Sequence, residues 1–228
     1  MVGIGKTGVP GLGLIAIPLM AFAFPAKESV GVLLLLLIVG DVFTVSYYRQ
    51  YANIKILLKL IPWVAVGIAV GSIFLSKLDN HTIRPILGLI VLIMLIIQIV
   101  RDKKGDPMIP DSRYLPAVIG ILAGCVTTIG NAAGPIMGIY LLMMHFRKDQ
   151  FMGTFGWFFL TVNCSKVPVF LYLGVLQGYA FYYALPLVPV IVLGAYFGKR
   201  LLGILSQKFF DGAVIAFAGL AAIILIIN

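Results

Sequence analysis

The sequence has little charge. Asp, Glu, Lys and Arg make up 11% of its 228 residues, whereas a soluble domain has about 25%. With 61% hydrophobic residues and a mean hydropathy of +1.10, this shortage excludes a soluble globular domain. The only two cysteines, Cys125 and Cys164, have no paired spacing, so neither a disulfide framework nor a zinc site is predicted. HExxH, GxSxG and paired catalytic carboxylates are also missing, so we predict no enzyme and no cofactor.

Long apolar runs fill most of the chain. They leave room for about seven or eight membrane-crossing elements of about 20 residues. The fold class predicted is therefore an all-α polytopic membrane protein with the lipid bilayer as its surroundings. Most of the basic residues behind the net charge of +9 lie in short loops, which indicates membrane topology rather than nucleic-acid binding.

The two halves of the chain resemble each other. Residues 11–31 resemble residues 133–153 at an offset of about 121 to 122. A Pro-x4-Gly-x3-Gly pattern at 62–71 recurs at 189–198 with an offset of 127. The Gly-x3-Gly spacing is itself typical of closely packed helices. Together the matches predict an internal duplication.

Each half is expected to hold a broken or re-entrant hairpin followed by three transmembrane helices. Prolines and glycines interrupt the apolar sequence at 1–24 and again, in TTIGNAAGP, within 114–145. The resulting domains are a first membrane repeat at 1–100, a charged linker at 101–113 and a second membrane repeat at 114–228. Helices are predicted near 30–48, 60–76, 84–100, 151–175, 180–198 and 208–227.

The distribution of basic residues favours opposite orientations for the two repeats. If 114–145 crosses the membrane once, lysines and arginines divide 8 to 7 between the two sides. If it dips in and returns, 12 lie on one side and only Lys27, Lys77 and Arg84 on the other. The positive-inside rule favours the second arrangement, with the linker in the cytoplasm and the repeats inverted.

Three charged residues remain inside apolar segments: Lys6, Asp41 and Lys166. Charge at membrane depth is costly and commonly marks a substrate pathway. Asn163 and Lys166 are three residues apart, hence on one helix face, and Ser165 is adjacent. The repeat register places Asp41 opposite Asn163 and Thr44 opposite Lys166. A structural ion pair between Lys166 and Asp41 is the alternative interpretation.

The broken segments offer a second set of candidates. Exposed backbone N–H groups at the start of a half-helix attract oxyanions. Local helix capping by the threonines and the asparagine, and a flanking anchor role for Lys6, are the alternatives. The substrate-binding residues predicted in these segments are Lys6, Thr7, Gly8, Thr127, Thr128 and Asn131.

These features resemble a known family. GKTGVPGLGLIAIPL with PAKESVG, followed by the duplicated GNAAGP half, is similar to the TauE/SafE family of sulfite and organosulfonate exporters over nearly the whole chain. The resemblance implies ATP-independent transport of small sulfur-containing or organic anions across the bacterial inner membrane.

The hypothesis is a secondary transporter, with export as the direction that the resemblance implies. Lys166 and Lys6 are the predicted positive poles for a small anion, and Lys166 is its predicted principal contact. Asn163 and Ser165 are predicted to bind the anion as well, and Asp41 and Thr44 to serve in coupling or an ion pair. The alternative is a non-transporting membrane assembly or sensor subunit. The first hairpin also has a short first limb, with seven residues before Gly8 against sixteen before Asn131. We therefore expect the natural reading frame to begin upstream of Met1, by about 10 to 15 apolar residues.

Overall fold

The computed structural model describes residues 1–24, 26–77 and 114–227, with isolated helical positions between 89 and 100. The predicted linker at 101–113 lies outside the described residues, as does most of the helix predicted near 84–100. Every regular element in the described ranges is helical, and none of these residues forms a strand.

The first half begins with a short helix and an irregular segment before its long helices. Its elements are α1 (Val2–Thr7), a 3₁₀ turn (Leu12–Ile15), α2 (Ala16–Ala23), α3 (Ala26–Tyr48), a 3₁₀ turn (Arg49–Tyr51) and α4 (Ile54–Lys77). The interruption predicted within 1–24 is confirmed: α1 ends at Gly8, and Gly11 has a φ of 102°, which favours glycine.

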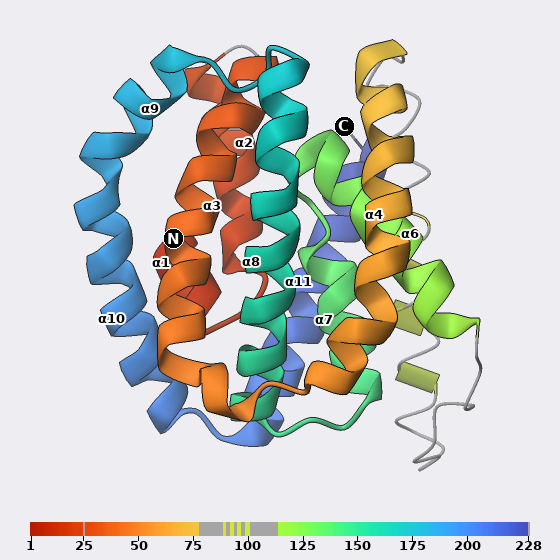
Figure 1. Ribbon diagram of the computed structural model, residues 1–228. Helices are drawn as coiled ribbons and strands as arrows, with labels where there is room; N and C mark the ends of the chain where they lie inside the picture. The colour runs from red at the N-terminus through yellow and green to blue at the C-terminus, as the bar shows by residue number, and fades with distance from the viewer. Residues whose placement is uncertain are drawn as a thin grey trace.

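The second half has the same order of a broken segment and long helices. Its elements are α6 (Leu115–Gly130), α7 (Gly134–Met143), α8 (Lys148–Tyr172), α9 (Gly178–Ala184), a 3₁₀ turn (Leu185–Leu187), α10 (Val188–Ile204) and α11 (Gln207–Ile227). The break predicted within 114–145 is confirmed. Asn131 ends α6 in the left-handed conformation, with φ 55° and ψ 24°, and α7 starts three residues later. In Figure 1 α6 rises from the lower right and α7 descends, so this segment is a hairpin.

Four described helices are long and apolar enough to cross a membrane: Glu28–Tyr51, Ile54–Leu75, Gly178–Ile204 and Gln207–Ile224. They confirm an all-helical, multi-pass membrane protein. The long helix α8 is not among them and lies in the interior beside α3, where it buries polar residues as well as phenylalanines. The central helices α3 and α8 therefore carry buried polar groups, while the other three apolar spans, which are less buried than α3, have the composition that lipid contact requires.

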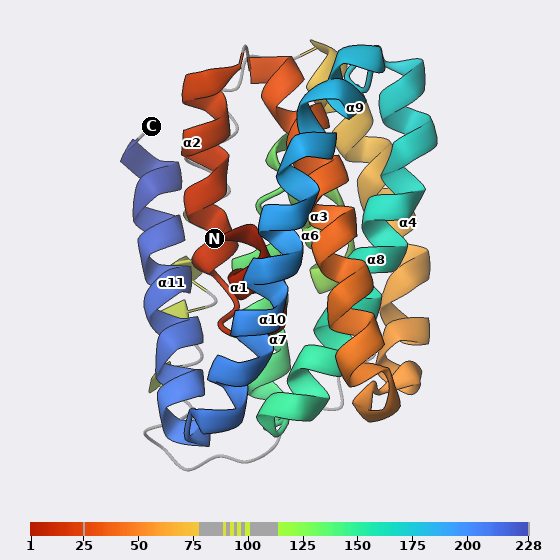
Figure 2. The same ribbon diagram turned by 90° about the vertical axis from the view of Figure 1, so that its left-hand side faces the viewer.

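Glycines bring two outer helix pairs into backbone contact. On α4, Gly67 and Gly71 lie against the backbone of α6, and the α6 glycines Gly120 and Gly124 lie against α4. On α10, Gly198 lies against Ile4 and Thr7 of α1. Figure 1 shows α4 beside α6 at the right-hand edge of the molecule and α10 beside α1 at the left, and in Figure 2 α10 lies in front of α1. The first limb of each broken segment is thus held by a helix of the other half.

Candidate functional site

Lys6 reaches the centre of the protein from the short helix α1. Its side chain is buried, and Gly40 of α3 makes room for it, because a Cβ at Gly40 would lie 2.9 Å from Lys6 Cγ. Lys6 Nζ lies 2.5 Å from Oδ1 of the fully buried Asp41. The alternative ion pair suggested by the sequence joined Asp41 to Lys166, whereas the structure joins it to Lys6.

Asp41 also contacts Asn163, the residue at the equivalent position of the second half. Asn163 Nδ2 donates to Asp41 Oδ2 at 2.7 Å, so α3 and α8 meet through two side chains that are 122 positions apart. Close by, the Thr44 hydroxyl donates to the carbonyl oxygens of Lys6, at 2.7 Å, and Gly40, at 2.9 Å. These bonds fix α1 against α3.

Lys166 is completely buried, and neutral oxygens surround its ammonium group. Nζ donates to the Thr127 carbonyl at 3.0 Å, to the Thr127 hydroxyl at 2.9 Å and to Asn131 Oδ1 at 2.6 Å. An ammonium has three protons to donate, so these acceptors satisfy it in this conformation. Asn131 Nδ2 in turn donates to the Val30 carbonyl at 3.1 Å. Lys166 therefore fixes the end of α6 and the turn that follows it.

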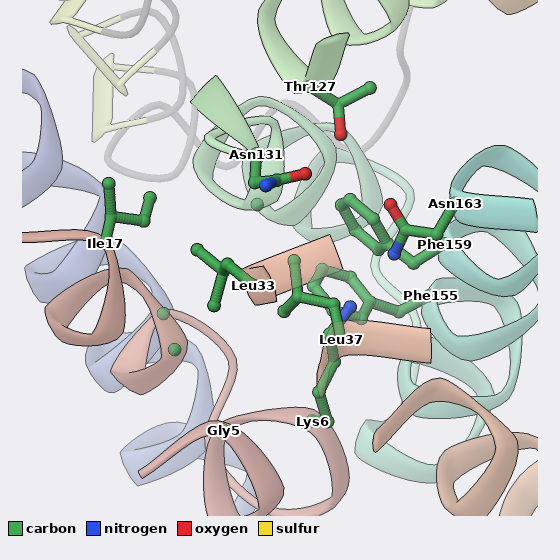
Figure 3. A pocket seen from close by; sticks show the side chains of 13 residues that line it. Gly5, Lys6, Ile17, Leu33, Leu37, Thr127, Asn131, Phe155, Phe159 and Asn163 are labelled. Atoms are coloured by element: carbon green, nitrogen blue, oxygen red, sulfur yellow. The ribbon is translucent and has the colours of Figure 1, made fainter. Parts of the chain in front are cut away.

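A small cavity lies between the two broken segments, α3 and α8 (Figure 3). Its volume open to the centre of a water-sized molecule is about 40 Å³. Because roughly 10 to 15 Å³ of such volume holds one water, there is room for a few waters or an anion of a few heavy atoms. The lining residues are Gly5, Lys6, Gly11, Gly13, Ile17, Leu33, Leu37, Thr127, Asn131, Gly134, Phe155, Phe159 and Asn163.

Four of the predicted site residues line this cavity: Lys6, Thr127, Asn131 and Asn163. Asp41, Thr44 and Lys166 lie behind them and bond to them. The structure thus gathers seven of the predicted residues into one buried cluster.

The other predicted residues lie apart from the cavity. The Thr7 hydroxyl donates to the carbonyls of Gly3 and Ala195, and Gly8 lies against Gly198 of α10. The Thr128 hydroxyl donates to Gly124 O. Ser165 is exposed and its hydroxyl donates to Thr161 O.

Two aromatic residues of the cavity were missed in the sequence. The Lys6 ammonium lies 4.3 Å from the ring centroid of Phe159 and 5.9 Å from that of Phe155. A signal was available, because Phe155, Phe159 and Asn163 are spaced by four residues and so share one face of α8. Their rings form an apolar wall that limits the water around Lys6.

The cluster holds more basic than acidic side chains. It contains two lysines, Lys6 and Lys166, and one carboxyl group, Asp41, all buried. Buried charge is expensive unless paired, so an anion in the cavity would stabilise the protonated form of the lysine that the carboxylate does not neutralise. The start of α7 adds to this effect, since Gly134 lines the cavity and is the first residue of that helix.

Comparison with known proteins identifies a family. A family model described as sulfite exporter TauE/SafE matches residues 2–225. Neither the curated proteins nor the solved structures give a significant match.

Proposed function

Because the chain belongs to the TauE/SafE family of sulfite exporters, we propose that it is a secondary transporter of small sulfur-containing or organic anions, such as sulfite or sulfonates. It would export them across the bacterial inner membrane without ATP. The observation that carries this proposal is the cavity itself, which is about the size of such an anion and is lined by the buried Lys6.

In this proposal Lys6 is the direct contact of the anion. Only one proton of its ammonium is needed for Asp41, so others remain for an oxygen of the substrate. Thr127 adds a hydroxyl whose oxygen already accepts from Lys166, which leaves the hydroxyl proton for the substrate. Lys166 acts through Thr127 and Asn131, by holding them and by its charge.

We further propose that residues 1–100 and 114–228 are inverted repeats. The reciprocal contacts support this arrangement: α4 of the first half packs on α6, and its counterpart α10 packs on α1. Thr44 donates to the Lys6 carbonyl, and at the equivalent position Lys166 donates to the Thr127 carbonyl. A substrate site between two such halves is the plan of many secondary transporters.

The experiment is flux in liposomes that contain only the purified protein. Vesicles loaded with sulfite should release it faster with wild-type protein than without protein, and no ATP should be required. Lys6→Met keeps the apolar stem and removes the charge, so its flux should fall to the protein-free rate. Lys59→Met makes the same change at an exposed position of α4 and should retain flux. Equal release from vesicles with and without wild-type protein would favour the assembly or sensor role.

A further inference from the structure

The side chain of Asn163 has one end satisfied and one end without a partner. It is completely buried, and its Nδ2 donates to Asp41 Oδ2 at 2.7 Å. Its Oδ1 accepts no hydrogen bond from any of the described residues. Buried polar atoms are nearly always paired, so this oxygen indicates where a ligand group belongs.

The orientation of the Asn163 amide follows from chemistry. Asp41 is in an ion pair with Lys6 and, as a carboxylate, can only accept hydrogen bonds. The amide end that faces it must therefore be the NH₂ group, which turns Oδ1 away from Asp41. Figure 3 shows this oxygen on the side of the cavity where Thr127 and Asn131 lie.

The other polar groups of the cavity complement an anion but leave Oδ1 unsatisfied. Lys6 and the Thr127 hydroxyl can donate to the oxygens of an anion. The Asn131 amide is directed elsewhere, since its NH₂ donates to Val30 O and its oxygen accepts from Lys166. None of these groups bonds to Asn163 Oδ1 in the structure, so an occupant of the cavity that carries its own donor can satisfy it.

We infer that the cavity selects a small oxyanion that carries its own hydrogen-bond donor, and that Asn163 Oδ1 accepts that proton. This inference rests on the proposed function and sharpens its substrate class. Among sulfur oxyanions it favours singly protonated hydrogen sulfite over the sulfite dianion. An anion without a donor would place an oxygen or a methyl group against Oδ1 and leave it unpaired, which carries the desolvation penalty of a buried acceptor.

A matched pair of ligands tests the inference. Hydrogen sulfite and methanesulfinate are both singly charged, pyramidal sulfur anions with the same number of heavy atoms, and a methyl group in the second replaces the hydroxyl in the first. Binding to the purified full-length protein would be measured by calorimetry at a mildly acidic pH, where hydrogen sulfite predominates. Wild type should bind hydrogen sulfite about tenfold more tightly. In Asn163→Leu the preference should fall to within about twofold, whereas the exposed neighbour control Cys164→Ala should keep it.

A measurement on wild type alone keeps the test independent of folding in the variant. Hydrogen sulfite loses its proton near neutral pH, so the apparent affinity for total sulfite should fall as pH rises through that range. Lys6 of α1, Asp41 of α3 and Lys166 of α8 are the charged groups around Asn163, and their own titration would affect methanesulfinate equally. If the affinity for methanesulfinate stays constant over the same pH range, the fall in affinity for total sulfite is caused by deprotonation of hydrogen sulfite.

The outcomes separate the two levels of the proposal. Equal affinity of wild type for the two anions overturns the inference about Asn163 and leaves anion transport standing. A wild-type preference that persists in a folded Asn163→Leu variant also overturns it, because a group other than Asn163 would then accept the proton of hydrogen sulfite. Failure to bind either anion overturns the proposed function itself.

Discussion

The two buried lysines of this protein are held in different ways. Lys6 is paired with a carboxylate and lines the cavity, whereas Lys166 is bonded to three neutral oxygens and lies behind it. A charge that has a carboxylate partner but keeps free donors is suited to bind a ligand. A charge whose donors are all used by the protein is suited to fix the groups around it. We therefore assign contact with the anion to Lys6 and positioning to Lys166.

The largest effect is expected for Lys6→Met. The variant removes the proposed contact and leaves Asp41 buried without its partner, so anion affinity should fall about 100-fold. Its free energy of unfolding should fall by about 3 to 5 kcal/mol, the usual cost of breaking a buried ion pair. Calorimetric titration and chemical denaturation in detergent would measure the two effects.

A double variant separates binding from stability. Lys6→Met with Asp41→Asn removes both charges, so most of the lost stability should return while anion binding stays lost. Recovery of binding in the double variant would mean that Lys6 acts only as the counter-ion of Asp41.

A smaller loss is expected for Lys166→Met. It leaves the Thr127 carbonyl and Asn131 Oδ1 without their donor, so the end of α6 should shift and anion affinity should fall about tenfold. Addition of saturating anion should restore the transport rate, since the cavity and Lys6 remain. If affinity fell as far as in Lys6→Met, Lys166 would be a direct contact and the comparison above would be wrong.

Asp41→Asn would convert Lys6 to the situation of Lys166, with a neutral partner in place of a carboxylate. Removing a negative charge beside the cavity should tighten anion binding by about threefold at low salt. The new amide oxygen can accept from Lys6, and a flipped Asn163 amide can accept from the new NH₂ group, so folding should be retained. Titrations at low and high ionic strength would detect the change, and weaker binding at both would indicate that Asp41 is needed to orient Lys6.

The smallest effect is expected for Thr44→Val, which changes the residue at the position equivalent to Lys166 in the first half. The valine has nearly the same shape and removes the hydroxyl that donates to Lys6 O and Gly40 O. Stability should fall by about 1 kcal/mol, and affinity should change less than twofold. A large loss of affinity would show that the α1 backbone must be held by this bond to present Lys6.

Much of the fold followed from the sequence because composition and helix breakers act locally. Apolar runs predicted the membrane class, and the breaks within 1–24 and 114–145 appear where glycine, proline and asparagine interrupt them. The helices predicted near 30–48 and 60–76 match α3 and α4, which begin a few residues earlier. Such breakers restrict the backbone directly, whatever the rest of the chain does.

The partners of the buried charges depended on tertiary arrangement. Helical spacing predicted that Asn163 and Lys166 share a face of α8, but spacing within one helix cannot say which lysine reaches Asp41. That choice depends on how deeply α1 inserts beside α3, which Gly40 permits by leaving space for the Lys6 side chain. Ser165 was predicted from adjacency alone, and neighbouring residues in a helix point about 100° apart, so it faces outward.

The contact between α1 and α10 has a consequence for how the chain is made. The Thr7 hydroxyl is bonded to the Ala195 carbonyl, 188 positions along the chain. At a synthesis rate of about 5 to 20 residues per second, α1 waits roughly 10 to 40 s for the helix on which it finally packs. Asp41 and Thr44 of α3 emerge much sooner and can already hold Lys6. The ion pair beside the cavity would thus also serve during biogenesis, by keeping a lysine-bearing helix in the bilayer until its partner arrives.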